Sequence, residues 1–253
     1  MKTEKAKFFN FKETKLLNFS FVKHIIVFFV GFVILNLLAS VITAIIVGTL
    51  PGETVKEQMA FYSSKPVYQM TVMTISYLTI FIALVLILLP NWKAIFEQFK
   101  DYRKYILGVL FGIGLMVFSA LYNAIFKESL SNENQTNVVN YMTQYPLFAI
   151  TIVAIIGPIC EELTYRVGLF SLCAKYKKWL AYVASALVFA VIHINFASTD
   201  IVTELISLPT YLVCGLTLAF AYDKFGLTTS TTAHVTNNLI AAIGAIMSAS
   251  LGA

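Results

Sequence analysis

Long apolar runs constrain the fold of this chain more than any other feature. Seven runs are each close to the roughly 18–20 residues with which a helix crosses a bilayer. They span about 24–47, 67–90, 105–126, 146–172, 179–197, 201–222 and 226–250. Only 12% of the residues are charged, about half the share in an average soluble domain. We therefore expect an all-α, polytopic membrane bundle of about seven helices, with eight as the alternative, forming one integral-membrane domain over residues 1–253.

The basic residues indicate how these helices are oriented. Fourteen of them precede the first run or follow the second, fourth and sixth, whereas three occupy the other loops. The fourteen are Lys2, Lys5, Lys7, Lys12, Lys15, Lys23, Lys93, Lys100, Arg103, Lys104, Lys175, Lys177, Lys178 and Lys224, and the three are Lys56, Lys65 and Lys127. Because cytoplasmic loops carry the excess of Lys and Arg, we expect a cytoplasmic N-terminus. If the chain crosses the membrane seven times, the C-terminus lies outside. An eighth crossing, or a re-entrant piece in the polar stretch 127–145, would change the side on which the C-terminus lies.

The net charge of +5 follows from this loop pattern and does not indicate a nucleic acid partner. The chain has 16 Lys but only 2 Arg, which favours an AT-rich bacterial genome, so we expect a bacterial cell membrane. The expected partners are the lipid bilayer and a substrate, and the sequence does not predict the oligomeric state.

Ionisable and amide side chains gather within the later runs. They are Glu161, Glu162 and Arg166 in the fourth run, His193 in the fifth, and His234 and Asn238 in the seventh. A helical rise of 1.5 Å per residue puts Glu161, His193 and His234 roughly 21, 22 and 15 Å from the nearest cytoplasmic Lys of their runs. Charges inside a bilayer are costly and usually functional, so we expect these groups to meet near its middle.

Spacing within each run adds detail. Glu162 and Arg166 lie four residues apart and can pair, as His234 and Asn238 can share one helical face. Pro158 is expected to loosen the helix before Glu161 and free backbone carbonyls there. Outside this group, we expect His24 at the membrane interface and Glu204 in solvent.

Two kinds of chemistry suit a carboxylate, two imidazoles and an amide at one depth. In the first, a carboxylate and a histidine activate a water, and a second histidine and the amide hold the oxyanion. In the second, Glu161, His193 and His234 bind a divalent metal, zinc, with one open position. The sequence contains no H-E-x-x-H helix and no G-x-S-x-G, and Cys160, Cys173 and Cys214 all fall in apolar runs. A covalent nucleophile is therefore not expected.

Three short motifs in order resemble those of the CPBP family. They are E-E-x-x-x-R (Glu161, Glu162, Arg166), F-x-x-x-H (Phe189, His193) and H-x-x-x-N (His234, Asn238), within residues 146–245, the expected catalytic core. This family comprises CAAX prenyl proteases of the Ras-converting-enzyme type and the bacteriocin-processing or bacteriocin-immunity proteins also called Abi. Val167 departs from the pattern, because a Gly after the Arg is common.

The resemblance implies an intramembrane endopeptidase. In it, Glu161 and His193 would activate water, His234 and Asn238 would hold the oxyanion, and Glu162 and Arg166 would support the site. The family is described both as zinc metalloproteases and as metal-free, glutamate-dependent proteases. We favour the metal-free account because Asn is a poor zinc ligand. Expected substrates are bacteriocin or signalling-peptide precursors, or CAAX-like proteins. The alternatives are a non-proteolytic regulator or immunity partner and an ion-coupled transporter.

Overall fold

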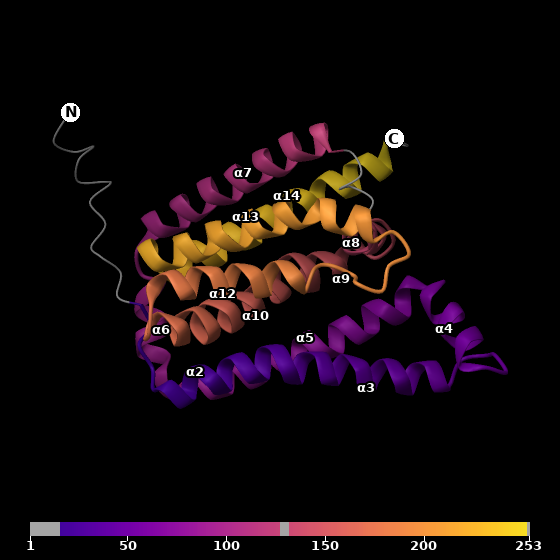
Figure 1. Ribbon diagram of the computed structural model, residues 1–253, viewed down its shortest axis with the longest axis horizontal. Coiled ribbons are helices and arrows are strands. Elements are labelled where there is room, and N and C mark those ends of the chain that lie inside the picture. Colours follow the sequence, from indigo (N-terminus) through magenta and orange to yellow (C-terminus); the bar gives the residue numbers. More distant parts are fainter. Residues whose placement is uncertain (1–15, 127–131, 252–253) are drawn as a thin grey trace.

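The computed structural model describes residues 16–126 and 132–251 (Figure 1). Over these residues the chain is helical, and no strand occurs in them. The N-terminal part comprises α2 (Phe21–Phe28), η1 (Phe29–Ile34), α3 (Leu35–Gly48), α4 (Val55–Ser63), α5 (Pro66–Leu88), η2 (Leu89–Asn91), α6 (Trp92–Gln98) and α7 (Tyr102–Ile125). The C-terminal part comprises α8 (Glu133–Gln144), α9 (Pro146–Ala149), η4 (Ile150–Ile156), α10 (Gly157–Glu162), η5 (Leu163–Phe170), α11 (Ser171–Ala174), α12 (Lys178–Val191), α13 (Ile201–Phe225) and α14 (Leu227–Ser250).

The predicted polytopic helical bundle is confirmed, and five of the seven expected spans are long and apolar enough to cross a membrane. These are Phe21–Gly48, Pro66–Gln98, Tyr102–Ile125, Pro146–Ala174 and Ile201–Phe225. The fifth expected span is instead the 14-residue α12, which rises only about 21 Å against a hydrocarbon core of about 30 Å. The seventh is α14, with 24 residues, whose first turns are rich in Thr and whose middle is polar.

Local sequence explains where several helices begin and end. Asp101 and Asp200 cap α7 and α13, because each side chain accepts a backbone N–H from the first turn that follows it. Pro66 starts α5 at a position where no backbone N–H is needed. Gly226 alone joins α13 to α14, with a φ of 93° that favours glycine. The polar stretch expected as an external loop or re-entrant piece contains the helix α8, which Asn132 caps.

The helix α14 lies among the others and packs against α7, α13, α10, η4 and α8 (Figure 1). Gly108 and Gly112, one turn apart on α7, allow a close approach, since a Cβ at Gly112 would lie 2.7 Å from the Ala233 carbonyl oxygen. The Thr228 and Thr229 hydroxyls donate to the Gln98 and Lys104 carbonyls. The polar residues of α14 are thus inside the protein, which explains how a helix too polar for lipid fits the bundle.

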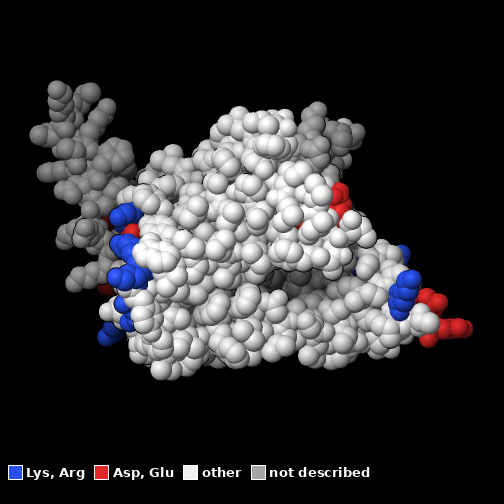
Figure 2. Space-filling view, in the orientation of Figure 1, with Lys and Arg blue, Asp and Glu red and all other residues white. Residues whose placement is uncertain are grey.

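Charged residues mark the two ends of the bundle. Among the described residues, Lys23, Lys93, Lys100, Arg103, Lys104, Lys175, Lys177, Lys178 and Lys224 belong to the end where α2, α7 and α12 begin (Figure 2). Lys56, in the first turn of α4, and Lys65, just after that helix, lie at the other end. The remaining basic residues of the orientation argument, Lys2, Lys5, Lys7, Lys12, Lys15 and Lys127, lie outside the described residues. Since α2 begins at one end and α14 finishes at the other, the described part of the chain makes an odd number of passes through the bundle (Figure 1).

Two residues expected at the surface are buried. His24 is 0% exposed, with Nδ1 donating to the Val167 carbonyl (2.6 Å) and Nε2 accepting from the Phe19 N–H (3.2 Å). Glu204 is 1% exposed and is surrounded by backbone and amide donors. The prediction that Glu204 is solvated was wrong because it considered only the position along a hydropathy run, whereas the partners of both residues come from distant segments.

Candidate active site

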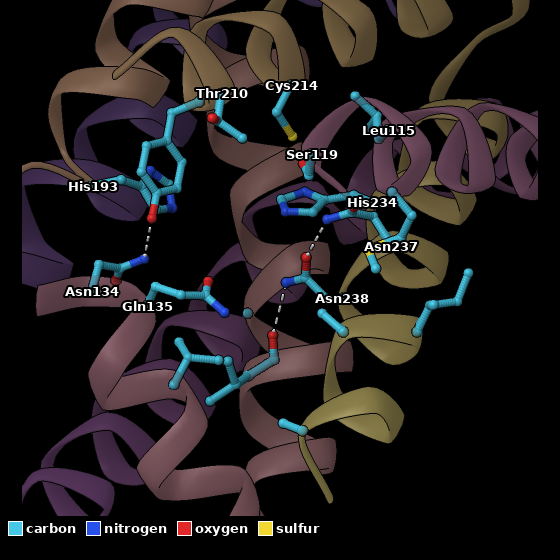
Figure 3. A pocket seen from close by; sticks show the side chains of 18 of the residues that line it. Leu115, Ser119, Asn134, Gln135, His193, Thr210, Cys214, His234, Asn237 and Asn238 are labelled. Atoms are coloured by element: carbon cyan, nitrogen blue, oxygen red, sulfur yellow. Dashed lines mark hydrogen bonds between the residues drawn. The ribbon is translucent and has the colours of Figure 1, made fainter. Parts of the chain in front are cut away.

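A cavity of about 590 Å³ lies among α5, α7, α8, α10, α13 and α14, and its lining includes Glu161, His193, His234 and Asn238 (Figure 3). The structure therefore brings to one cavity the four side chains that the sequence predicted as catalytic. Much of the remaining lining is apolar, including Met73, Leu115, Val138, Met142, Ile152 and Ile240. Pockets of this size, with few polar groups in apolar walls, are typical of ligand sites.

A second, smaller cavity of about 160 Å³ shares Tyr77, Asn134, Glu161 and His193 with the first. Its other lining residues come from η1, α3, α10, η5 and the turn after α12. Figure 2 shows that this face of the molecule is hollowed between the arm formed by α3 and α5 and the segment that follows α12. Glu161 thus faces two cavities rather than packed protein.

Glu162, Arg166 and His234 form a buried chain of contacts behind the cavity. The predicted pair exists: Arg166 Nε lies 3.2 Å from Glu162 Oε2, and both side chains are 0% exposed. Arg166 also donates from Nη1 to Ser185 Oγ (2.8 Å). The sequence did not predict that His234 Nδ1 lies 3.1 Å from Glu162 Oε1. A carboxylate at Nδ1 fixes the ring and directs Nε2 elsewhere, here toward Glu161.

The second carboxylate, Glu161, is less fully paired. Its Oε1 accepts the hydroxyl of Tyr77 (3.2 Å), and its Oε2 lies 3.8 Å from His234 Nε2. Among the described residues, no hydrogen-bond donor reaches Oε2, although that atom is buried. Tyr77 was missed because it is one of 13 tyrosines and lies on α5, outside every motif.

Asn238 is tied to an irregularity in the helix that carries Glu161. In a π-helical register an N–H bonds to the carbonyl five residues earlier, and η4 ends at Ile156, two residues before Pro158, which has no N–H. The Val153 carbonyl is therefore left without that donor, and Asn238 Nδ2 donates to it (3.1 Å; Figure 3). Asn238 Oδ1 in turn accepts from Asn237 (3.1 Å). The expectation that Pro158 frees a carbonyl near the site agrees with this contact.

His193 does not lie in a helix as predicted, because α12 ends at Val191 and His193 occupies the turn that follows. Its Nδ1 donates to the Phe189 carbonyl (2.6 Å), which leaves Nε2 as an acceptor. The ring is stacked on Tyr211, with centroids 4.6 Å apart and an interplanar angle of 17°, and packs beside Phe189 at 4.8 Å. These contacts hold the imidazole at the edge shared by both cavities.

The three donors predicted for a metal were Glu161, His193 and His234. Within residues 16–126 and 132–251, no three His, Cys, Asp or Glu side chains are grouped closely enough to hold a metal ion. Figure 3 shows His193 beside Asn134 on one side of the cavity and His234 beside Asn237 on the other. Because these side chains are not grouped around one point, this donor set does not fit a preformed zinc site, and no chemical step below uses a metal.

Comparison with known proteins identifies the segment that contains this site. Residues 143–240 match the family model described as type II CAAX prenyl endopeptidase, Rce1-like, which confirms the resemblance predicted from the three motifs. The chain is 26% identical over 122 residues to the UPF0177 protein YvdC of Lactococcus lactis subsp. lactis, covering 48% of this chain and 44% of the relative. It is 25% identical over 163 residues to an uncharacterized protein of Mycoplasma capricolum subsp. capricolum, covering 58% of this chain and 46% of that relative. The chain thus spans less than half the length of these curated relatives. No solved structure matches.

Proposed function

Taking residues 143–240 as a segment of the Rce1-like endopeptidase family, we propose that this multi-pass membrane protein is an intramembrane endopeptidase. It hydrolyses a peptide bond of a membrane-associated peptide with a water activated by Glu161. The observation that carries the proposal is that Oε2 of Glu161 is buried, that Glu161 lines the cavity, and that this oxygen has no hydrogen-bond donor among the described residues. A buried carboxylate oxygen requires such a donor, and water is the one that a polar cavity can supply.

Charge balance supports a protonated His234. The buried cluster contains the carboxylates Glu161 and Glu162, the guanidinium of Arg166 and one imidazole. With His234 protonated, the four groups carry no net charge, which is the least costly arrangement in a low-dielectric interior. Nδ1–H then donates to Glu162, and Nε2–H points toward Glu161 at a distance too long for a direct hydrogen bond. That N–H is available to a ligand.

The reaction follows from these positions. Glu161 Oε2 takes a proton from the water as the water oxygen attacks the peptide carbonyl carbon. The developing oxyanion accepts hydrogen bonds from His234 Nε2–H and from the second amide hydrogen of Asn238, whose first donates to Val153. The C–N bond then breaks as Glu161 gives its proton to the leaving amine.

Two further side chains orient the reacting groups. Tyr77 donates its hydroxyl to Oε1 of Glu161, which keeps Oε2 turned toward His234. His193, whose Nε2 is an acceptor, can hold the second hydrogen of the water and leave an oxygen lone pair for attack. The family resemblance implied this role for His193, and its place beside Glu161 in the lining of both cavities is compatible with the role.

The substrate is proposed to be an apolar, uncharged peptide segment. The cavity lining includes methionine, valine, isoleucine and alanine side chains, together with amide and hydroxyl groups from α7 and α8. Such a lining suits a precursor embedded at the membrane, such as a bacteriocin or signalling-peptide precursor or a CAAX-like protein. Glu162 and Arg166 support the site by holding His234.

The test compares membrane peptides from bacteria that produce the wild-type protein with those from bacteria that produce Glu161→Gln at the same level. We expect a precursor to accumulate and its fragments to disappear in the variant. The purified wild-type protein, but not the variant, then cleaves a synthetic copy of that precursor in micelles. Identical peptide sets, together with a retained cellular phenotype, would favour the non-proteolytic regulator or immunity partner instead.

A further inference from the structure

Glu204, in the first turn of α13, joins two segments that are far apart in the sequence. Its Oε1 accepts the backbone N–H of Glu133 (2.8 Å), and its Oε2 accepts the backbone N–H of Asn195 (3.0 Å). Asn132 Nδ2 contacts the same Oε2 at 3.4 Å and Ser207 Oγ at 3.1 Å. A carboxylate with 1% exposure is costly unless donors surround it, so these contacts are what make its burial tolerable.

The negative charge of Glu204 is stabilised by the N-terminal end of a neighbouring helix. None of the ion pairs among the described residues involves this carboxylate. Glu133 is instead the first residue of the 12-residue α8, where backbone N–H groups lack intrahelical partners and the helix dipole favours an anion. Asn132 caps the same end by accepting the Gln135 N–H (2.9 Å). Glu204 thus adds an anionic cap from a different helix.

Each of the two segments that Glu204 contacts is connected to His193, one along the chain and the other through Tyr211. Asn195 follows His193 by two residues, and its side chain also donates to the Glu133 carboxylate. From α8, Asn134 donates to the hydroxyl of Tyr211 (3.0 Å), whose ring is stacked on His193 (Figure 3). The turn that carries His193 and the helix that covers its cavity are therefore connected through one carboxylate.

We propose that Glu204 is a positioning residue that fixes His193 and clamps α8 over the active-site cavity. The proposal rests on the proposed function, since it assigns Glu204 a role in the same site. Because Glu204 is not part of the cavity lining and its carboxylate does not contact Glu161 in the described contacts, the carboxylate acts through Asn195 and α8. Its loss should release the His193 turn while the far end of the bundle stays intact.

The test is Glu204→Gln in the full-length protein in micelles, with Asp200→Asn as the matched control. Gln keeps the size of the side chain but turns one acceptor into an NH₂ that faces N–H donors. Asp200 is the N-cap of α13, four residues before Glu204, and its side chain accepts the N–H and the hydroxyl of Thr203, so Asn remains a good cap there. Three ring signals are expected from protein labelled at histidine Cε1, because the chain has three histidines, and His193→Ala assigns one of them.

We expect Glu204→Gln to shift or broaden the His193 signal, to leave the His24 signal unchanged, and to speed amide hydrogen exchange in residues 132–144 and 192–200. With the precursor peptide as substrate, kcat should fall at least about tenfold while KM changes less than about twofold, since a misplaced group affects the transition state most. Asp200→Asn should match the wild type in all of these measurements. If Glu204→Gln does not fold, Asn134→Ala breaks the same connection from α8 and should shift the same His193 signal.

An unchanged His193 signal in a folded Glu204→Gln protein would overturn the proposal. So would faster exchange throughout the bundle, including α3 and α5, because that indicates a general loss of stability. The ring signals and the exchange do not need a cleaved substrate. A wild-type protein without peptidase activity would therefore refute the proposed function and leave the positioning role to be decided by these two readouts.

Discussion

The packing of α7 against α14 determines where His234 lies, so a substitution that separates the two helices should change both stability and activity. Gly112 faces α14 so closely that an added Cβ would lie 2.7 Å from both the Ala233 carbonyl oxygen and Thr236 Cβ. Ordinary van der Waals contact begins at 3.4 Å, so Gly112→Ala requires the two helices to move apart by about 0.7 Å. The nearest atoms on α14 belong to the backbone of Ala233 and to the β-branched side chain of Thr236, and neither can rotate out of the way.

The cost should appear in both stability and activity. Overpacking a close contact typically costs about 1–3 kcal/mol of unfolding free energy. Because His234 directly follows Ala233, the displacement is passed to the imidazole, and a shift approaching 1 Å in a catalytic group can lower kcat by about 10²-fold. We expect Gly112→Ala to lower the midpoint of thermal unfolding in micelles and to reduce cleavage of the precursor peptide by about one to two orders of magnitude.

Gly114 supplies the control on the same helix. A Cβ at Gly114 meets no atom within 4 Å, and replacing Gly by Ala inside a helix usually adds about 0.5–1 kcal/mol of stability. Gly114→Ala should therefore unfold at the same or a higher temperature and retain full activity. If Gly112→Ala and Gly114→Ala behave alike, α14 is not packed on α7 as described, and the derived position of His234 is wrong.

Three further predictions concern the site. Tyr77→Phe should slow cleavage about 10- to 100-fold with little change in thermal unfolding, because it removes a hydrogen bond to a charged group; full activity would show that Tyr77 does not orient Glu161. Arg166→Met should lower the unfolding free energy by about 3–5 kcal/mol in denaturant titrations, since it leaves the Glu162 carboxylate buried and uncompensated. Adding Glu162→Gln to the Arg166→Met protein should recover stability but not activity. No recovery of stability in this double variant would argue against the pair. Treatment with 1,10-phenanthroline should leave the cleavage rate unchanged, whereas loss that added zinc restores would support a metal mechanism.

The parts of the site that the sequence predicted are those that depend on local spacing. The pair of Glu162 and Arg166 follows from residues four apart on one helix. The shared depth of Glu161 and His234 follows from counting residues to the charged ends of their helices, which needs no knowledge of the neighbouring helices. Pro158 likewise predicts a free backbone carbonyl nearby, although the sequence did not show that Asn238 would donate a hydrogen bond to it.

The parts that the sequence missed depend on which helices are neighbours. Tyr77 reaches Glu161 only because α5 packs against α10, and no motif predicts that packing. Glu204 was expected in solvent because its donors come from α8 and from the turn after α12. Hydropathy also did not show that α14 is enclosed by other helices, since an apolar run does not distinguish a helix in lipid from one that other helices surround.

The most direct test of the account is the cleavage rate of the purified protein in proteoliposomes, at equal amounts of folded protein, with the precursor peptide identified in cells. Wild type is compared with Glu161→Gln and with Glu97→Gln, which alters an exposed carboxylate that pairs with Lys100. Removing a general base typically costs about 10²–10⁴ in rate. We predict a loss of that size for Glu161→Gln and none for Glu97→Gln. Equal rates for Glu161→Gln and wild type would contradict the claim that Glu161 activates the water.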